Sequence, residues 1–536
     1  MKKVKNFMAA IMAIALIGFV GCSDSTGEID NQNTEEANAY LKFEIAITDN
    51  AGTKGAEDSG IPEAANSHEN KISNLYLYFF NESDDKFVAK TVVPTASLSE
   101  SGVGGVNSES IPVKFPSVPG TYRVIAVANE ANTALEALTT ANVMTDALAS
   151  TIDAATLAWT SSATPSLVMA SRTSNSETDE FYGSAPYVEF TIAAANTKDS
   201  PIAISMTMER TVAKLTFRAH NAGSTTANEY EIGTGDNECV VEIDGYRVVN
   251  LNNSGYVFRN TVKQNLADLG YGNIYDVAHT ADVNGRPVYP TGGNPYIYVW
   301  DPISTDKKID ANNELDFTGG ATALDAAYAN HVANIINDGA SASFTATPTN
   351  TALYTLMGYC AENTAEWNAQ RNGYSTGVIF RGKVKPTTVY DASGTTVSDL
   401  TTLTDFYYST KSNKFYFNAA AVVADATTQF SNVSEITDAE ARGLAFLEAM
   451  GLQKFIDGYC YYTYWVEHEK STTKNQIMEF AIVRNNTYNM KIASLAKLGT
   501  SEIFIDPNDP NELTELFFTV ELTIRPWIVR ENDINF

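Results

Sequence analysis

The strongest constraint on the fold is an alternation of apolar and polar side chains that recurs in short stretches along the chain. In FFTVELTIRPW (517–527), apolar residues occupy every second position from Phe518 to Ile524, and Thr or Glu lies between them. An early stretch, AYLKFEIAIT (39–48), has the same pattern. Successive side chains of a strand point to opposite faces, so this alternation predicts strands with one buried side.

Composition agrees with this reading, because 27 Tyr and 25 Phe in 536 residues favour sheets over helices. Helical spacing is limited to a few segments, one of which is Thr437–Met450. Thr437 and Glu440 form a capping-box pattern there, and Gly451 follows as a stop signal. We predict an all-β protein with a few helices, built as two tandem transthyretin-like, Greek-key β-sandwich domains.

The N-terminal segment, residues 1–22, predicts an export signal rather than a folded element. A Lys-rich start precedes an apolar run that is short for a membrane span, and Gly21-Cys22 closes it. A small residue before Cys is typical of a bacterial lipobox, which makes Cys22 the predicted lipidation site. Phe19 departs from the Leu usual in such boxes. The alternative is a plain signal peptide with an incidental cysteine.

Several classes of function are disfavoured by the sequence. The net charge of −28 argues against binding nucleic acid or anionic membrane surfaces. The chain has no HExxH, GxSxG, Walker or dinucleotide motif, so we predict no enzyme activity, no metal and no cofactor. The acidic run DPNDPNE (506–512) could offer oxygen ligands to calcium, but an acidic loop between strands is the simpler interpretation. The three cysteines after Cys22 lie far apart in sequence and indicate buried thiols.

Several motifs resemble the fimbrillin family, the type V pilins of Bacteroidales, and the resemblance is nearest to the major subunit of short fimbriae. They occur in a consistent order along most of the chain: GTYRVIAVAN (120–129), MERTVAKLTF (208–217), YCAENT (359–364) with STGVIFRGKV (375–384), GYCYYTYWVEHE (458–469), MEFAIVRNNTYNMKI (478–492) and LTIRPW (522–527). The resemblance implies export as an outer-membrane lipoprotein to the cell surface and cleavage there by a trypsin-like protease in the loop after the first strand. It also implies that removal of this strand opens a groove, which a strand of another subunit fills.

In this sequence the loop offers one basic residue, so the predicted cut lies between Lys54 and Gly55. The family often has Arg at this position, and the Lys leaves the identity of the protease open. The predicted parts are therefore a signal peptide (1–22), a propeptide with tether and first strand (23–54), an N-terminal sandwich with the acceptor groove (55–204), and a C-terminal sandwich that ends in the donor strand (205–536).

Strand exchange requires that the two strands have interchangeable apolar faces. Each has four large apolar residues at alternate positions: Leu41, Phe43, Ile45 and Ile47 in the displaced strand, and Phe518, Val520, Leu522 and Ile524 in the donor strand, with Trp527 as a further anchor. The alternative is that both strands pair within their own domains, as most strands do. Strand addition supplies backbone hydrogen bonds and side-chain pockets together, and head-to-tail contacts yield a filament.

We therefore predict a structural shaft subunit of a surface fimbrium that polymerises with itself and supports adhesion and biofilm formation. The predicted partners are anchor and tip accessory subunits, the processing protease, and host or bacterial surface receptors. One alternative is that the chain is itself a tip or anchor subunit. Another is a surface glycan-binding lipoprotein with an aromatic platform in GYCYYTYWVEHE, although alternation there points about half of the aromatic residues inward.

Overall fold

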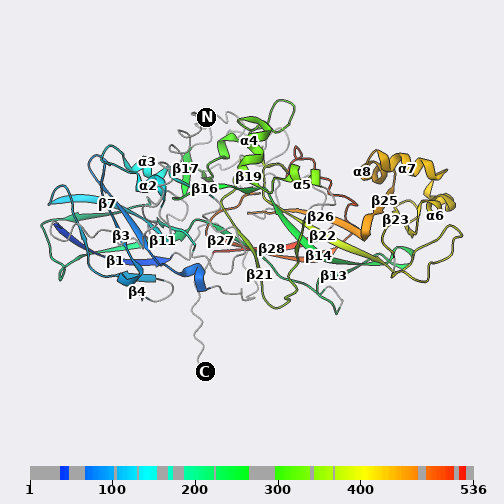
Figure 1. Cartoon of the computed structure of the whole chain (residues 1–536), viewed down its shortest axis with the longest axis horizontal. Coiled ribbons are helices and arrows are strands. Elements are labelled where there is room, and N and C mark those ends of the chain that lie inside the picture. Colours follow the sequence, from blue (N-terminus) through cyan, green and yellow to red (C-terminus); the bar gives the residue numbers. More distant parts are fainter. Residues whose placement is uncertain are drawn as a thin grey trace, which may run out of the picture.

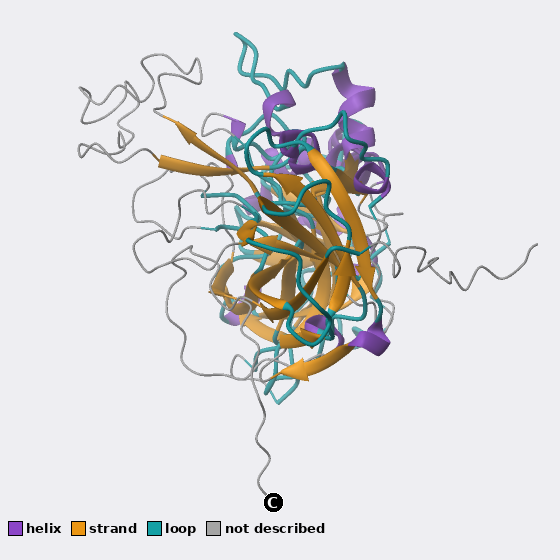
Figure 2. Ribbon diagram, turned by 90° about the vertical axis from the view of Figure 1, so that its left-hand side faces the viewer, coloured by secondary structure: helices purple, strands orange, loops and turns teal. Residues whose placement is uncertain are grey.

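The structure is a computed structural model that describes these residues: 37–47, 67–101, 105–129, 132–153, 167–172, 186–221, 225–264, 296–338, 343–365, 369–401, 403–468, 479–511 and 518–526. It is elongated, with the N-terminal strands at one end and the C-terminal strands toward the other (Figure 1). The helices lie at the periphery of the strand layers (Figure 2). This mainly β architecture confirms the predicted fold class, while the Greek-key topology and the number of domains stay predictions.

The N-terminal part is one ten-stranded sheet with the order β3-β2-β7-β9-β11-β1-β5-β4, in which β10 pairs with β7 and β6 with β1. Its strands are β1 (Ala39–Ile47), β2 (Leu75–Asn81), β3 (Phe87–Val93), β4 (Leu98–Ser101), β5 (Gly105–Ser108), β6 (Ile111–Val113), β7 (Gly120–Ala128), β9 (Met169–Arg172), β10 (Val188–Ile192) and β11 (Ile202–Arg210). Both faces are covered. One packs into a core that includes Leu41, Leu77 and Phe79, and the short helices α2 (Thr133–Glu136) and α3 (Met144–Leu148) pack on the other.

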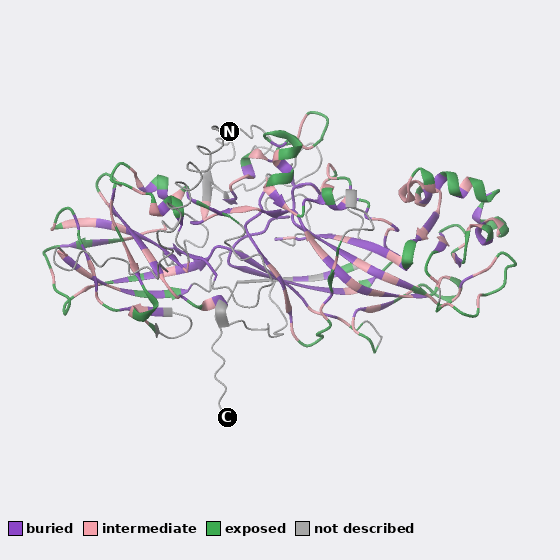
Figure 3. Ribbon diagram, viewed as in Figure 1, coloured by how far each residue is buried: buried purple, intermediate pink, exposed green. Residues whose placement is uncertain are grey.

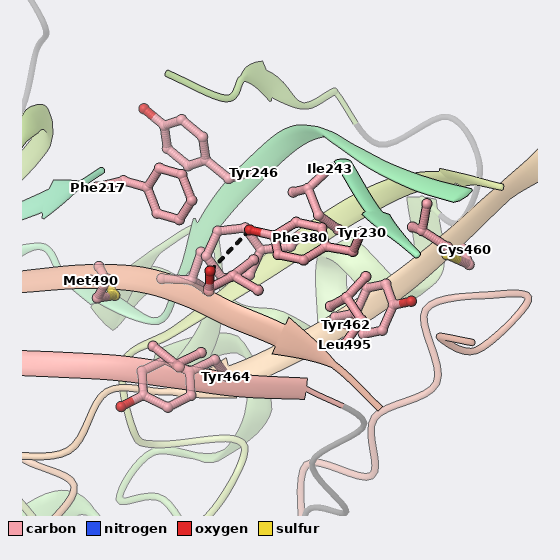
Figure 4. Close-up of a cluster of buried hydrophobic side chains, with 14 of the residues drawn as sticks. Phe217, Tyr230, Ile243, Tyr246, Phe380, Cys460, Tyr462, Tyr464, Met490 and Leu495 are labelled. Carbon is pink, nitrogen blue, oxygen red and sulfur yellow. Dashed lines mark hydrogen bonds between the residues drawn. The ribbon is translucent and has the colours of Figure 1, made fainter. Parts of the chain in front are cut away.

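The C-terminal part has two facing sheets. One has the order β21-β12-β27-β28, and the other has the order β13-β14-β22-β26 with β20 paired to β14. Their strands are β12 (Ala213–Phe217), β21 (Thr355–Cys360), β27 (Asn486–Leu495) and β28 (Phe518–Pro526), and β13 (Glu229–Ile232), β14 (Cys239–Val249), β20 (Thr345–Ala346), β22 (Gly377–Pro386) and β26 (Tyr459–Trp465). Apolar side chains from both sheets form one core, where Leu495 of β27 lies beside Tyr462 of β26 (Figure 4).

Shorter elements surround these sheets. They are β8 (Thr151–Asp153) with β16 (Ser254–Tyr256), β15 (Leu251–Asn252) with β19 (Tyr328–Ala329), β17 (Asn260–Gln264) with β18 (Tyr296–Trp300), and the helices α4 (Gly320–Ala327) and α5 (Val332–Asp338). A lobe between β22 and β26 contains β23 (Phe406–Ser409), β24 (Lys414–Tyr416), β25 (Leu452–Phe455), α6 (Ala419–Ala424), α7 (Val433–Ala441) and α8 (Leu444–Ala449). It forms the far end of the molecule and carries many exposed residues (Figure 3).

One helix prediction, which falls in this lobe, was wrong in its limits. The single helix expected from residue 437 to 450 is two helices, α7 and α8, and α7 begins four residues earlier than expected, at Val433. Asn432 caps it by accepting a hydrogen bond from the Glu435 amide at 2.9 Å, so Thr437 lies inside the helix. Gly443, with φ of 116°, separates the two helices. Gly451 follows α8 with φ of 90°, as its role as a stop signal requires.

The chain passes from the N-terminal sheet to the C-terminal part in one extended run. β11 stays in the N-terminal sheet through Arg210, and β12 begins at Ala213 in the next sheet. The boundary predicted between residues 204 and 205 therefore falls inside β11, because MERTVAKLTF continues one strand into another without a turn. In the described part of the chain, no helix has the length and apolar character of a membrane span, and no three His, Cys, Asp or Glu side chains group as metal ligands.

The burial of β1 predicts a large effect of Phe43→Ala on the uncleaved protein. Phe43 is fully buried, so we expect the substitution to lower the free energy of unfolding by about 3–5 kcal/mol, measured by urea denaturation. Glu44→Ala, on the exposed side of the same strand, is the matched control and should change it by about 0.5 kcal/mol or less. Equal effects of the two substitutions would contradict the inward orientation of Phe43.

Candidate functional site

The first strand is seated in the interior of the N-terminal sheet. β1 runs parallel to β11, from Leu41 opposite Ile202 to Ile47 opposite Met208, and antiparallel to β5 and β6 on its other side. The four apolar side chains predicted for this strand are all buried in one core, as the alternation predicted, and their relative exposures are 0% for Leu41, 0% for Phe43, 3% for Ile45 and 5% for Ile47. Their role as a displaced strand stays a prediction.

Side chains from other segments also bind the backbone of β1. The Tyr40 amide donates to Asn196 Oδ1 at 2.8 Å, and Asn196 Nδ2 donates back to the Tyr40 carbonyl at 2.9 Å. The Phe43 amide donates to Ser108 Oγ at 2.9 Å. Burial of the four large side chains contributes about 6–12 kcal/mol, at about 1.5–3 kcal/mol each. Loss of this strand would expose an apolar slot between β11 and β5 together with unpaired backbone groups.

The predicted cleavage site lies in the segment that connects β1 to the rest of the chain. Lys54 and Gly55 are outside the described residues, as is Cys22. The described ends of the segment, Ile47 and the short 3₁₀ helix η1 (Ser67–Asn70), both lie next to the end of β11. Ile47 pairs with Met208, and Arg210 Nε donates to the Glu69 carbonyl at 3.0 Å. The segment thus starts and ends in the same region of the molecule.

The predicted donor strand, β28, pairs with a strand of its own C-terminal part. β28 lies at the edge of its sheet, antiparallel to β27, from Asn486 opposite Pro526 to Leu495 opposite Phe518. Val520 and Leu522 are 7% and 8% exposed and belong to the C-terminal core. The side chains of Phe518 and Ile524, and all of Trp527, are outside the described residues.

This placement is the within-domain pairing that the sequence left open. A donor role of β28 therefore requires the strand to leave β27 and to expose the core face that it covers. Its edge position makes this possible, because only β27 is hydrogen-bonded to it within the described chain. The donor assignment stays a prediction.

Between the two parts of the molecule lies a buried set of polar residues that the sequence reasoning missed. We call Glu69, Arg210, Lys214 and Tyr359 the junction cluster. Both Lys214 Nζ, at 2.9 Å, and the Tyr359 hydroxyl, at 2.6 Å, donate to Glu69 Oε1. Arg210 is fully buried, and its guanidinium donates to Asn485 Oδ1 at 3.0 Å and also to Asn70 Oδ1. The junction cluster fixes η1 to β11, β12 and β21.

Two further buried carboxylates form ion pairs with arginines near the point where the chain passes from β11 to β12. Glu209 accepts from Arg259 Nη2 at 2.7 Å and from Arg172 Nη1 at 3.3 Å. Burial by itself would raise the pKa of Glu209, but these two guanidinium groups outweigh it and hold the pKa below its usual value. Glu362 pairs with Arg484 Nη2 at 2.8 Å, and both side chains are fully buried. Unpaired, each of these charges would be strongly destabilising.

The signal for these ion pairs was present in the motifs. Glu209, Arg210 and Lys214 lie in MERTVAKLTF, Tyr359 and Glu362 lie in YCAENT, and Arg484 and Asn485 lie in MEFAIVRNNTYNMKI. Charged residues inside otherwise apolar strands indicate buried pairs, but the sequence alone does not say which charges meet. The structure brings the three motifs together in one place.

The candidate aromatic platform in GYCYYTYWVEHE is part of the interior. Tyr461, Tyr462, Tyr464 and Trp465 are all less than 9% exposed, and Tyr459 is partly buried. Cys239, Cys360 and Cys460 are free, buried thiols, as predicted. Nothing in the described part of β26 offers a flat exposed aromatic surface to a sugar.

Comparisons with known proteins define the class. Residues 453–533 match the C-terminal family model of the type IV major fimbrial subunit protein, fimbrillin. Residues 30–306 match the model of the fimbrillin-A associated anchor proteins Mfa1 and Mfa2. These are structural, non-enzymatic proteins of cell-surface fimbriae, so the class is that of fimbrial subunits. Because the second match covers more than half of the 536 residues, the chain belongs to the family of fimbrillin-A associated anchor proteins Mfa1 and Mfa2.

Solved structures of low identity are also similar over most of the chain. A candidate cell adhesion protein from Parabacteroides distasonis has 12% identity and a TM-score of 0.41, with 92% of this chain and 98% of that chain covered. The C-terminally truncated tip fimbrial protein Mfa3 from Porphyromonas gingivalis has 11% identity and a TM-score of 0.36, with 91% and 99% covered. No curated protein matches the chain.

Removal of the lysine from the junction cluster should destabilise the fold more than removal of a surface lysine. Lys214→Met leaves the buried Glu69 carboxylate without its cation, so we expect the free energy of unfolding to fall by about 3–5 kcal/mol in urea denaturation. The control is Lys90→Met, which breaks the exposed 2.9 Å pair with Glu136 and should cost about 1 kcal/mol or less. A loss at Lys214 no larger than that at Lys90 would contradict a structural role of the junction cluster.

Proposed function

We propose that this chain is a shaft subunit of a surface fimbrium and that it polymerises by exchange of its first strand for a strand of another copy. In this proposal the precursor is lipidated at Cys22 and cut after Lys54 by a trypsin-like protease. Loss of the first strand then opens a groove, which accepts the donor strand of a neighbouring subunit. The fibre supports adhesion and biofilm formation, with anchor and tip subunits at its ends and surface receptors as targets.

The observation that carries the proposal is the position of β1. It is the first described strand, it is buried in the sheet interior, and only one segment, residues 48–66, joins it to the rest of the chain. A cut in this segment would leave β1 held by noncovalent contacts alone. η1 would stay in place because the junction cluster holds it. Only the segment before the cut would then be lost, and β2 would stay in the sheet.

The donor is the second part of the proposal. β28 has an apolar face with the same spacing as β1, and it is the last described strand. β28 lies at the edge of its own sheet, so it has to break only the one row of backbone hydrogen bonds that joins it to β27. In the groove of another copy it would gain two rows, one with β11 and one with β5 and β6, which favours the exchanged state.

A second candidate function is supported by the family match. The model over residues 30–306 describes anchor proteins, so the chain could serve as the anchor or tip subunit of a fimbrium. An anchor would keep its lipid and β1, whereas a shaft subunit would lose both. The fate of β1 therefore separates the two candidates.

A disulfide across β1 and β11 tests the exchange directly. Glu44 and Ser205 are opposite each other on parallel strands and both are exposed. Neighbouring strands lie about 4.7–4.9 Å apart, within the range of Cα separations that a disulfide spans, so Glu44→Cys/Ser205→Cys should form a bond with little strain. In an oxidising medium we expect this variant to be cut after Lys54 yet to remain a monomer on SDS gels run without boiling. Reduction should restore the high-mass ladder.

The single variants Glu44→Cys and Ser205→Cys are the matched controls and should form ladders under both conditions. Lys54→Ala should leave an unpolymerised precursor that retains its lipid. Ladders from the oxidised double variant, with its disulfide verified by mass spectrometry, would show that β1 does not have to leave and would refute the proposal. An uncut wild-type protein that keeps β1 at the cell surface would favour the anchor role.

A second disulfide tests whether β28 is the donor. Ser494 and Thr519 are opposite each other on β27 and β28, and both are small and exposed, so Ser494→Cys/Thr519→Cys should tether β28 to its own sheet. We expect oxidised protein to accept a strand from wild-type subunits but to donate none, so it should cap growing ladders. Self-assembly of the oxidised variant at the wild-type rate would contradict β28 as the donor.

A further inference from the structure

A second buried cluster lies away from the strands that take part in the proposed exchange. Lys307 follows the 3₁₀ helix η5 (Ser304–Asp306), Asp301 follows β18, and Asn363 follows β21. Lys307 Nζ donates to Asp301 Oδ2 at 2.8 Å, to Asn363 Oδ1 at 2.7 Å and to the Thr364 carbonyl at 2.7 Å. The side chains of Lys307 and Asp301 are completely buried, and Asn363 is 2% exposed.

The amine is close to the carbon atom of the Asn363 amide. A C=O bond is about 1.23 Å long, so this carbon lies within about 3.9 Å of Nζ whatever the angle at the oxygen. Reacting atoms in productive complexes are about 3–3.5 Å apart, so a small movement brings nitrogen and carbon into attack distance. The two groups are held in a site without bulk water, where a competing hydrolysis is suppressed.

The amide of Asn363 is held in one orientation. Its Nδ2 donates to the Asn250 carbonyl at 3.0 Å, to the Tyr374 carbonyl at 2.9 Å and to Thr376 Oγ1 at 2.9 Å. These three acceptors fix the position of Nδ2, so that Oδ1 of the same amide faces Lys307. Asn363 therefore presents an electrophilic carbon to the amine and directs its leaving nitrogen away from it.

The surroundings also favour a nucleophilic amine. Burial lowers the pKa of Lys307, although Asp301 partly opposes this effect. Loss of one proton from the ammonium would give the neutral form that attacks carbonyl carbons. Asp301 is the base at hand, because its carboxylate is already hydrogen-bonded to this nitrogen.

We propose that Lys307 and Asn363 join in an intramolecular isopeptide bond, with Asp301 as the group that transfers the proton. Asp301 takes a proton from the Lys307 ammonium, and the amine forms a bond to Cγ of Asn363. In the tetrahedral intermediate a proton of the newly bonded Lys307 nitrogen passes to the amide nitrogen, the bond between Cγ and the amide nitrogen breaks, and ammonia leaves. The ammonia takes up the proton held by Asp301, so the products are a secondary amide and an ammonium ion, Asp301 is again a carboxylate, and no oxidant is needed.

The bond would tie the segment after β18 to the loop after β21 by a covalent link. β21 pairs with β12, so the link would fasten the segment after β18 to the sheet that also holds β28. In a fibre under tension, residues 308–362 could then not be pulled out as an extended chain. The inference does not depend on strand exchange, because it concerns a single folded chain.

The test is the intact mass of folded, full-length protein together with a peptide map. We expect the mass to be lower than the sequence requires by one ammonia molecule, and a branched peptide to contain both Lys307 and Asn363. Lys307→Arg and Asp301→Ala should each show the full mass. Lys308→Arg, at the exposed neighbouring lysine, is the control that should keep the loss.

The wild-type measurement decides the question even where a variant fails to fold. Folded wild-type protein with the full sequence mass, and with Lys307 and Asn363 in separate linear peptides, would overturn the inference. Lys307 would then be only the buried cation of an ion pair with Asp301. The same mass loss in Lys307→Arg would equally refute it, since an ammonia lost elsewhere would explain the wild-type result.

Discussion

The rest of the structure depends on the ion pairs that hold the crossing from β11 to β12. This extended run carries the chain between its two parts, and its charged residues are buried at the point where the sheets meet. A buried charge that loses its partner costs about 3–5 kcal/mol, so Arg210, Glu209 and Lys214 are stable here only with their partners. These partners come from η1, β9, the residues before β17 and the residues before β27, and the contacts thereby join segments that are far apart in the chain.

The same crossing connects the two strands that we assign to assembly. β1 lies against β11, β11 continues into β12, β12 pairs with β27, and β27 pairs with β28. A pull on β28 would reach the N-terminal sheet through two rows of strand hydrogen bonds and one covalent run. The junction cluster lies along this route, so under the proposed assembly its buried charges would resist such a pull as well as stabilise the fold. Three of the motifs that resemble fimbrillins, MERTVAKLTF, MEFAIVRNNTYNMKI and LTIRPW, lie on the same route.

Much of the fold was predictable because it follows from local patterns. Alternation located β1 and β28 and the buried side of β1, since a strand has the same period wherever it is placed. Helix limits were less accurate in the lobe, where Asn432 rather than Thr437 begins α7, because two capping signals lie within one turn and a half of each other and packing selects between them. The sheet change at residues 211–212 was missed because two strands follow each other without a turn residue.

The sequence by itself determined the class of protein, the mainly β architecture, the inward face of β1 and the inward positions of Val520 and Leu522 in β28. Only the tertiary structure decided which sheet each strand joins, that β28 pairs with β27, and that charges from three distant motifs meet at one buried crossing. The physical reason is the range of the interactions. Periodicity and caps act over a few residues, whereas strand partners and ion pairs join residues such as Glu69 and Tyr359, which are 290 positions apart and meet only in the folded chain.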